Sequence, residues 1–478
     1  MPARATKIVA TLGPASSDPD LLEAMIRAGV NVVRLNFSHG TAEDHQNRAR
    51  LVREASQRAG REVAIMADLQ GPKIRVGKFA SGKVMLEPGQ PFVLDADRTE
   101  LGDGQGVGLD YKALPSDLKA GDTLLLNDGL IVMKVVRVAG AAVHTEVVVG
   151  GELSNNKGIN KQGGGLTAPA LTAKDMEDIK TAMALQADFV AVSFPKSATD
   201  MELARQLCHV ACPPGHKPGL VAKIERAEAI PELENILRAS DGIMVARGDL
   251  AVEVGNAAVP ALQKRMIRLA HEHDRFVITA TQMMESMIHA PVPTRAEVSD
   301  VANAVLDGTD AVMLSAETAA GKYPLQTVRE MAQICEAAEK ADDHALESDF
   351  MGKRFHRIDQ SIAMGALFTA SHLGAKAIVA LTESGSTALW MSRHKVNIPI
   401  YAVTSRLATQ RRMTMYRNVR PLLMDTSADR DTALLQAENY LKERGIVKTG
   451  DIYAITCGEP MGTPGGTNML KLCRVGSP

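Results

Sequence analysis

The stretch 220–253, LVAKIERAEAIPELENILRASDGIMVARGDLAVE, decides the fold class that the sequence predicts. Two short apolar runs within it, at 220–222 and 242–245, are typical of buried strands. Between them, residues 227–240 place apolar side chains at helical spacing and predict a helix. A strand, a helix and a second strand in this order indicate a parallel α/β fold.

Charged side chains follow both apolar runs directly. Lys223, Glu225 and Arg226 end the first run, and Arg247, Gly248 and Asp249 come just after the second. Ligands of parallel α/β folds bind at the carboxyl ends of the strands. Two carboxylates beside a lysine suit a divalent cation and an anionic substrate, because the cation offsets the repulsion between the carboxylates. The alternative is a structural ion pair between Lys223 and one carboxylate.

The same alternation of strands and helices runs through most of the first two thirds of the chain. Strands are expected at 7–12, 30–35, 62–66, 189–193, 220–224, 242–246, 276–280 and 311–314. Eight such units in one domain predict a closed (β/α)8 barrel of the TIM type. The strand ends bring seven polar residues to one mouth: Arg34, Asp68, Lys223, Glu225, Asp249, Thr281 and Glu317. This convergence favours catalysis, because stability alone does not require it.

Two other regions flank or interrupt the barrel. Residues 72–165 lack helical periodicity, which predicts a small inserted all-β domain, expected to be a β-barrel, with 163–165 as its return hinge. The barrel domain would then comprise 1–71 and 166–344. From 345 to 478 helices alternate with strands expected at 377–381, 398–403, 422–424 and 452–456, which predicts a C-terminal α/β domain.

A hydroxyl-rich turn follows the first strand of this C-terminal domain. It contains Thr382, Ser384, Gly385, Ser386 and Thr387. Hydroxyls and free amides at a helix start form a phosphate cradle, but such a turn is equally consistent with an ordinary helix cap. Residues 462–468 form a second flexible loop, which could close over a ligand or only join strands.

Composition excludes several classes of function. The net charge of -2 gives no support for binding to nucleic acid or membranes, and 3% aromatic residues argue against base stacking. Five cysteines without a CxxC pair fit a reducing compartment, and Cys208 and Cys212 around His209 favour packing over a zinc site. With neither a signal-like apolar segment nor a run long enough to span a membrane, we expect a cytoplasmic protein.

Several longer motifs together resemble one known family. They are VVRLNFSHG at 32–40, ADLQGPKIR at 67–75, NKGIN at 156–160, AKIER at 222–226, VARGDL at 245–250, TATQMMESM at 279–287, the run from PTRAEV to GKYP at 293–324, and TESGST at 382–387. Over essentially its whole length the chain resembles pyruvate kinases, more specifically their bacterial, potassium-independent branch. The resemblance implies a barrel with a β domain inserted after its third strand and a C-terminal regulatory domain.

The resemblance also implies transfer of the phosphoryl group of phosphoenolpyruvate to ADP, which gives pyruvate and ATP. By this similarity, Glu225 and Asp249 would hold Mg²⁺ or Mn²⁺. Lys223 and Arg34 would contact the phosphoryl group. The amides of Gly248 and Asp249, with the Thr281 hydroxyl, would bind the substrate carboxylate, and Thr281 would lie on the route by which the enolate gains its proton.

The remaining implied sites concern the nucleotide, a monovalent cation and regulation. Arg75 and Lys157 would reach the nucleotide phosphates, Lys157 from a mobile lid. Asn36, Ser38 and Asp68 match the monovalent-cation site of the family. Lys73 stands where many members have glutamate, so its ammonium would replace K⁺. The turn 382–387 would bind a sugar phosphate or a nucleotide monophosphate, and the assembly would be a homotetramer.

Two other functions are compatible with parts of the sequence. A metal-dependent aldolase or lyase acting on pyruvate enolate would need the same carboxylates, but it would explain neither the insertion with Lys157 nor the C-terminal domain. A catalytically dead sensor of sugar phosphates would use only the turn 382–387, and the full set of catalytic residues argues against it. An assay with phosphoenolpyruvate and ADP separates the three.

Overall fold

The centre of the molecule is a closed barrel of parallel strands. This computed structural model describes residues 4–341, 354–425 and 429–476. The barrel strands are β1 (Lys7–Thr11), β2 (Val32–Asn36), β3 (Ala64–Asp68), β12 (Phe189–Val192), β13 (Gly219–Ile224), β14 (Gly242–Ala246), β15 (Phe276–Ala280) and β16 (Ala311–Leu314). They close in the order β1-β16-β15-β14-β13-β12-β3-β2, which confirms the predicted TIM barrel. Their nearly continuous burial is typical of parallel strands covered on both faces.

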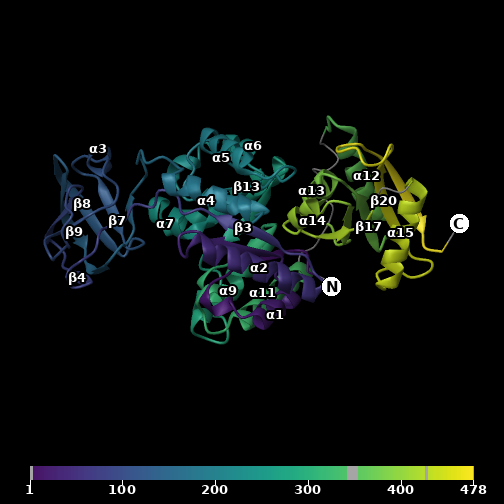
Figure 1. The fold of residues 1–478 in the computed structure, drawn as a ribbon, viewed down its shortest axis with the longest axis horizontal. Helices are drawn as coiled ribbons and strands as arrows, with labels where there is room; N and C mark the ends of the chain where they lie inside the picture. Colours follow the sequence, from purple (N-terminus) through teal and green to yellow (C-terminus); the bar gives the residue numbers. More distant parts are fainter. Residues whose placement is uncertain (1–3, 342–353, 426–428, 477–478) are drawn as a thin grey trace.

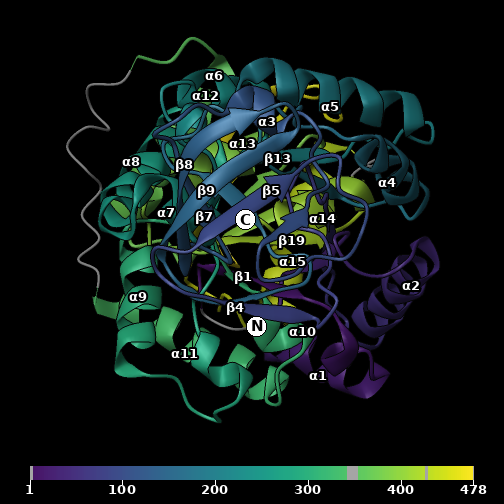
Figure 2. The same cartoon turned by 90° about the vertical axis from the view of Figure 1, so that its left-hand side faces the viewer.

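Helices surround the barrel as an outer ring, which Figure 2 shows from the side of the insertion. They include α1 (Pro19–Ala28), α2 (Ala42–Ala59), α4 (Ala173–Ala184), α5 (Ala198–Ala211), α8 (Val259–Glu272), α9 (Arg295–Leu306) and α11 (Pro324–Ala341). The helix expected over 227–240 was wrong as one element. The chain instead forms a 3-10 turn at Ala227–Ala229 and then α6 (Leu233–Ala239). Pro231 lies between them, and proline has no N–H to continue a helical ladder.

The chain between β3 and α4 forms a separate all-β region, at the left in Figure 1. Its strands are β4 (Lys83–Leu86), β5 (Pro91–Asp95), β6 (Gly106–Gly108), β7 (Thr123–Leu126), β8 (Ile131–Ala139), β9 (Ala142–Val149), β10 (Gly151–Ser154) and β11 (Ile159–Lys161). They form a six-stranded sheet and a two-stranded sheet around an apolar core of their own. Among the described residues the six strands do not close into a ring, so the β-barrel and the limits 72–165 stay predictions.

The C-terminal region is an α/β domain, as predicted. Its elements are α12 (Ile358–His372), β17 (Ala377–Leu381), α13 (Ser386–Ser392), β18 (Ile400–Thr404), α14 (Leu407–Met413), β19 (Val419–Leu423), α15 (Arg430–Glu443), β20 (Ile452–Gly458) and β21 (Thr467–Arg474). The sequence analysis missed β21, which pairs antiparallel with β20 and is mostly exposed, so it lacks a clear apolar pattern. The expected boundary at 345 lies outside the described residues.

The inserted region and the C-terminal domain occupy opposite ends of the barrel (Figure 1). The insertion leaves from the carboxyl end of β3, while the C-terminal domain packs on the amino ends of the strands. Lys7 at the start of β1 donates to the Val419 carbonyl at 2.5 Å, and the buried Arg393 pairs with Asp310 just before β16. The mouth of the barrel therefore faces the insertion. No helix in the described ranges is long and apolar enough to cross a membrane.

Candidate active site

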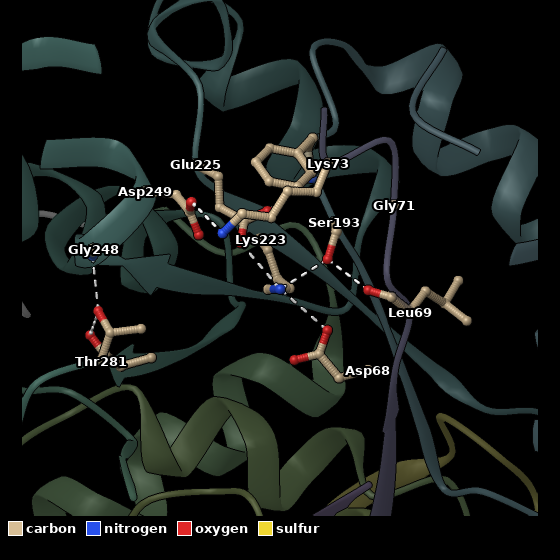
Figure 3. A network of polar contacts seen from close by, with 12 residues as sticks. Asp68, Leu69, Gly71, Lys73, Ser193, Lys223, Glu225, Gly248, Asp249 and Thr281 are labelled. Carbon is tan, nitrogen blue, oxygen red and sulfur yellow. Dashed lines mark hydrogen bonds and ion pairs between the residues drawn. The ribbon is translucent and has the colours of Figure 1, made fainter. Parts of the chain in front are cut away.

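Lys223 is the centre of a buried network at the mouth of the barrel (Figure 3). Its ammonium lies 3.0 Å from Glu225 Oε1 and 3.1 Å from Asp68 Oδ1, and it donates a hydrogen bond of 2.8 Å to Ser193 Oγ. Lys223 lies at the carboxyl end of β13 and Glu225 follows that strand. Asp68 ends β3, and Ser193 follows β12. The predicted convergence of strand ends thus holds for Lys223, Glu225 and Asp68.

The charges of this network stabilise one another. Burial acts to lower the pKa of Lys223, but the carboxylates of Asp68 and Glu225 outweigh it and raise that pKa. Burial also acts to raise the pKa of Asp68, yet Arg34 and Lys223 hold it below its ordinary value. The pKa of Glu225 is raised, mainly by burial, with the nearby Asp249 and Asp68 adding to the effect against Lys223. A bound cation would therefore favour the charged form of Glu225.

Arg34 is fixed against Asp68 from the opposite side. Its Nε donates to Asp68 Oδ2 at 2.5 Å, and its Nη1 donates to Thr11 Oγ1 at 3.1 Å. Asn36 and Asp68 are direct register partners at the ends of β2 and β3. Asn36 Oδ1 accepts from the Ser38 amide at 3.1 Å, so the three residues that match a monovalent-cation site do lie together.

Lys73 and Asp249 form the second pair of opposite charges at the mouth. Lys73 Nζ lies 3.3 Å from Asp249 Oδ1, and about a quarter of the Lys73 side chain is exposed. The lysine thus points into the site rather than to solvent, as Figure 3 shows. Its Cε also lies close to Gly158 of the insertion, where an added Cβ would approach to 3.1 Å. Lys73 therefore connects the metal-ligand candidate Asp249 with the inserted region.

Thr281 and Gly248 are already joined in this structure. Thr281 Oγ1 accepts from the Gly248 amide at 2.8 Å and donates to the Ala280 carbonyl at 2.8 Å. Thr281 has a φ of +67°, which is strained for a β-branched residue. Arg247 holds this turn by donating to the Ala280 and Thr281 carbonyls at 3.1 and 2.7 Å.

Three residues that position the site, Arg247, Asp300 and Ser193, were given no role from the sequence. Arg247 fixes the Thr281 turn, and Asp300 in α9 holds Arg247 at 2.6 Å. Ser193 donates its hydroxyl hydrogen to the Leu69 carbonyl at 2.7 Å, so it presents only lone pairs to Lys223. Gly71 packs on Ser193. The position of Ser193 at the end of a strand was the only hint of its role in the sequence. Serines at strand ends are too common for this hint to single it out.

The nucleotide candidates lie on two adjacent segments of the insertion. Arg75 forms a β-bridge with Gly158, and its Nη1 donates to the Asn156 carbonyl at 3.1 Å. The carbonyl of Lys157 accepts from the Val76 amide at 2.9 Å. Arg75 and Lys157 are therefore neighbours. Glu317, also expected at the mouth, follows β16 and accepts hydrogen bonds from the backbone amides of Met284 and Ser315.

The turn 382–387 adopts the geometry of a helix start. Gly385, with φ +84°, precedes α13, and its amide donates to Thr382 Oγ1 at 2.9 Å. The hydroxyls of Ser384 and Ser386 lie 2.9 Å apart, and Thr387 contacts Thr467 at the same distance. Residues 461–463 and 465 line the same cavity, which measures about 30 Å³. This narrow space is partly open to solvent.

The donor chemistry of the mouth fits a divalent cation. Glu225 and Asp249 offer the oxygen ligands that Mg²⁺ and Mn²⁺ prefer, with substrate and water to complete the shell. Within the described residues there is no cluster of three His, Cys, Asp or Glu side chains that could hold a metal alone. The residues Cys208, His209 and Cys212 accordingly form no such cluster.

Two known protein families match the sequence of the chain. The family described as "Pyruvate kinase, barrel domain" matches residues 3–328, and "Pyruvate kinase, alpha/beta domain" matches 360–473. The chain belongs to the pyruvate kinase family. Pyruvate kinases transfer the phosphoryl group of phosphoenolpyruvate to ADP in glycolysis, and the chain is a phosphotransferase of this family. They require a divalent metal, typically Mg²⁺.

Individual pyruvate kinases resemble the chain over nearly its full length. Pyruvate kinase II of Salmonella typhimurium is 51% identical, covering 99% of both chains. A pyruvate kinase of Haemophilus influenzae is 50% identical, covering 98% of both. The crystal structure of a pyruvate kinase from Cryptosporidium parvum superposes with a TM-score of 0.92 at 32% identity, covering 99% of this chain and 96% of that one.

Proposed function

We propose that phosphoryl transfer takes place around Lys223, with Glu225 and Asp249 as the protein ligands of Mg²⁺ or Mn²⁺. The observation that carries this proposal is the Lys223 ammonium, buried at 3.0–3.1 Å from two carboxylates at the barrel mouth. The bound cation would neutralise charge on the substrate oxygens. Its charge would also favour the ionised form of Glu225, whose pKa burial raises.

Lys223 would stabilise the phosphoryl group in flight, since charge spreads over its oxygens in the transition state. Ser193 supports this role because its lone pairs hold the ammonium at 2.8 Å. Arg34 would contact the same phosphate with the guanidinium atoms that Asp68 and Thr11 do not occupy. Arg34 and Lys223 would thus meet the phosphate as cations already fixed in place.

The substrate carboxylate would bind at the amides of Gly248 and Asp249 and at the Thr281 hydroxyl. At present the Gly248 amide donates to Thr281 Oγ1, and the substrate would replace that contact. The Thr281 hydroxyl, with its turn fixed by Arg247, would then lie on the proton route to the enolate. Arg75 and Lys157 would bind the nucleotide phosphates from the insertion, which would close as a lid.

Lys73 would make K⁺ unnecessary for this enzyme. Its ammonium carries the same unit charge as K⁺ and is tethered inside the mouth. Lys73 would give up its ion pair when Asp249 binds a metal, and its charge would then be available to the substrate phosphate. Asn36, Ser38 and Asp68 are the equivalents of the monovalent-cation ligands.

Regulation would use the turn 382–387, whose hydroxyls and amides suit a phosphate of a sugar phosphate or a nucleotide monophosphate. Because the present cavity of about 30 Å³ is too small, the loop 459–468 would have to open first. We divide the chain into the barrel (1–71 and 166–344), the lid (72–165) and the regulatory domain (345–478). A homotetramer in the cytoplasm is the corresponding assembly and location.

The deciding experiment is an assay that couples pyruvate formation to lactate dehydrogenase. We expect ATP and pyruvate from phosphoenolpyruvate and ADP with Mg²⁺ present. Retro-aldol or lyase activity on pyruvate-derived substrates without phosphoryl transfer would indicate the aldolase function. Binding of sugar phosphates with no turnover would indicate a sensor.

A further inference from the structure

The chain returns from the insertion to the barrel through residues 160–166, which we call the return hinge. Gly163, Gly164 and Gly165 in this hinge have φ values of +78°, +80° and +91°, a region of conformation that favours glycine. The Gly163 amide donates to the Glu253 carbonyl at 3.3 Å, and the Gly165 amide donates to Glu228 Oε1. The hinge is therefore attached to the barrel domain through backbone amides of its own glycines.

Two segments of the barrel domain hold the return hinge. Glu228 lies in the 3-10 turn after β13, and Glu253 lies near the end of α7 (Arg247–Val254), on the side that faces the insertion (Figure 1). A Cβ on Gly164 would meet the Glu228 carboxylate at 2.5 Å, so this carboxylate packs directly on the hinge. The Arg226 guanidinium adds a contact by donating to the last carbonyl of the hinge at 3.2 Å.

Glu253 connects both barrel segments with the hinge. It is only 7% exposed, and its Oε2 accepts from the Ala227 amide at 2.8 Å. The side chain of Asn160, in β11, also hydrogen-bonds to it. Glu225 lies two residues before Ala227, and Asp249 lies one helical turn before Glu253. The contacts of Glu253 therefore link the hinge to both segments that carry the proposed metal ligands.

The negative charge of Glu253 lies in an unfavourable environment. Burial raises the pKa of Glu253 to about 7, and the charge of Glu228 adds to this rise. The Ala227 amide, Arg226 and Asn160 oppose it. Among the described residues, Glu228 Oε2 is buried without a hydrogen-bond partner. A proton on Glu253 would remove the repulsion between two carboxylates that both hold the hinge.

The other charged groups around this end of α7 are engaged elsewhere. Lys161 of β11 lies 3.3 Å from Asp122, and Asp249 on α7 itself lies 3.3 Å from Lys73. Residues 256–263, which form the next 3-10 turn and the start of α8, carry no charge. The carboxyl group at the end of α7 therefore titrates mainly in response to burial and to its two charged neighbours in the turn after β13.

We propose that Glu253 is a positioning residue whose protonated carboxyl group latches the return hinge to α7 and to the turn after β13, and whose deprotonation frees the insertion to move. The inference deepens the proposed role of the insertion as a lid and rests on it. A hinge that swings away would expose Glu253 to water, where glutamate has its ordinary pKa of about 4.3. Glu253 therefore binds its proton more tightly in the present arrangement. That arrangement is most stable at low pH and loses stability as the pH rises from about 4.3 to about 7.

Hydrogen exchange measured by mass spectrometry on the full chain, without substrate or metal, tests this latch. The observable is the exchange rate of the hinge amides 160–166 at pH 5.5 and 7.5, divided by the intrinsic chemical rate at each pH. We expect this ratio to rise about tenfold in the wild type, because the hinge opens more often once Glu253 favours its charged form. The ratio should stay constant in Glu253→Gln, whose neutral amide does not titrate. Glu87→Gln, at an exposed position of the insertion, is the matched control and should behave as the wild type.

Several outcomes overturn the proposal. They are a constant ratio in the wild type, an equal rise in Glu253→Gln, and a rise shared by the core strand β8, which would indicate general loosening. Should Glu253→Gln not fold, Glu228→Gln decides. Loss of the neighbouring charge should lower the pKa of Glu253 and reduce the rise about twofold, and an undiminished rise excludes the latch. Because no turnover is measured, failure here is distinguishable from failure of the proposed function in the coupled assay.

Discussion

The two ends of the barrel differ in how their charges are balanced. At the mouth, three carboxylates face three cations: Asp68, Glu225 and Asp249 against Arg34, Lys223 and Lys73. At the opposite end, a cavity between the barrel and the C-terminal domain is lined by five cations, Arg4, Lys7, Arg61, Arg420 and Arg444, and by Glu62, which pairs with Arg411. Glu339 acts on Arg4 and Lys7 from nearby. A balanced site keeps its cations fixed in place before substrate arrives, as transition-state stabilisation requires. At the opposite end, burial and the neighbouring cations lower the pKa of Lys7 and that of Arg61.

The largest effect is expected from removing the central cation of the mouth. Lys223→Met should reduce phosphoryl transfer about 10³-fold, because a charged group aimed at the transition state is lost. Metal binding should survive, and so should proton exchange at the methyl group of pyruvate, since enolisation does not need this lysine. The coupled assay and exchange by NMR measure the two activities. Lys180→Met, an exposed lysine of α4, is the control. Equal loss of both activities would give Lys223 a structural or proton-transfer role.

Removing one carboxylate charge should have the next largest effect. Glu225→Gln and Asp249→Asn should each weaken Mn²⁺ binding about tenfold or more, because a neutral amide is a poorer ligand for a hard cation. Titration of free Mn²⁺ by electron paramagnetic resonance measures this affinity. Glu177→Gln, an exposed residue of α4, should have no effect. Wild-type affinity in both site variants would show that the metal binds elsewhere.

The balance at the mouth predicts independence from potassium. We expect full activity in tetramethylammonium buffer with Mg²⁺, because Lys73 supplies the charge. Lys73→Glu should lower the rate about tenfold, which corresponds to roughly 1.4 kcal/mol, and should create a response to K⁺. The coupled assay at constant ionic strength checks both statements. A wild-type rate that rises tenfold or more with KCl would remove the basis for this role of Lys73.

The smallest effect on basal turnover is expected in the C-terminal domain. Replacing Ser384 and Ser386 by Asp should abolish activation by sugar phosphates, because like charges repel, while basal activity stays intact. Activation curves with and without the effector measure this. The neutral double variant with Asn at both positions separates charge from size. Persistent activation in the Asp variant would leave the turn 382–387 as a helix cap only.

The barrel could be predicted because its strands are continuous apolar runs that end in polar residues. The bounds of β14, β15 and β16 agree to the residue with the prediction, since each run ends abruptly. Pro231 could have ended the predicted helix, but the apolar spacing around it suggested continuity. The partly exposed β21 gave no periodic signal, and its order comes from pairing with β20 and packing against α12.

The site was predictable as a set of residues but not as a set of contacts. Strand ends converge in any closed barrel, so Lys223, Glu225 and Asp68 could be expected together. The partner of Lys73 could not, because it depends on how the chain turns into the insertion. The sequence placed Lys73 with the monovalent-cation ligands, whereas its ammonium pairs with Asp249. Ser193 and Arg247 act through backbone carbonyls, which no residue pattern reveals.

Gly71, at the exit to the insertion, limits how this enzyme can change by mutation. Its φ is +66°, and a Cβ there would meet the Cβ of Ser193 at 2.6 Å and the Phe194 ring at 3.1 Å. Conformation and space each exclude a side chain at this position. Any replacement would displace Ser193 and, through it, the catalytic lysine. The point at which the insertion departs from the barrel can therefore accept almost no variation.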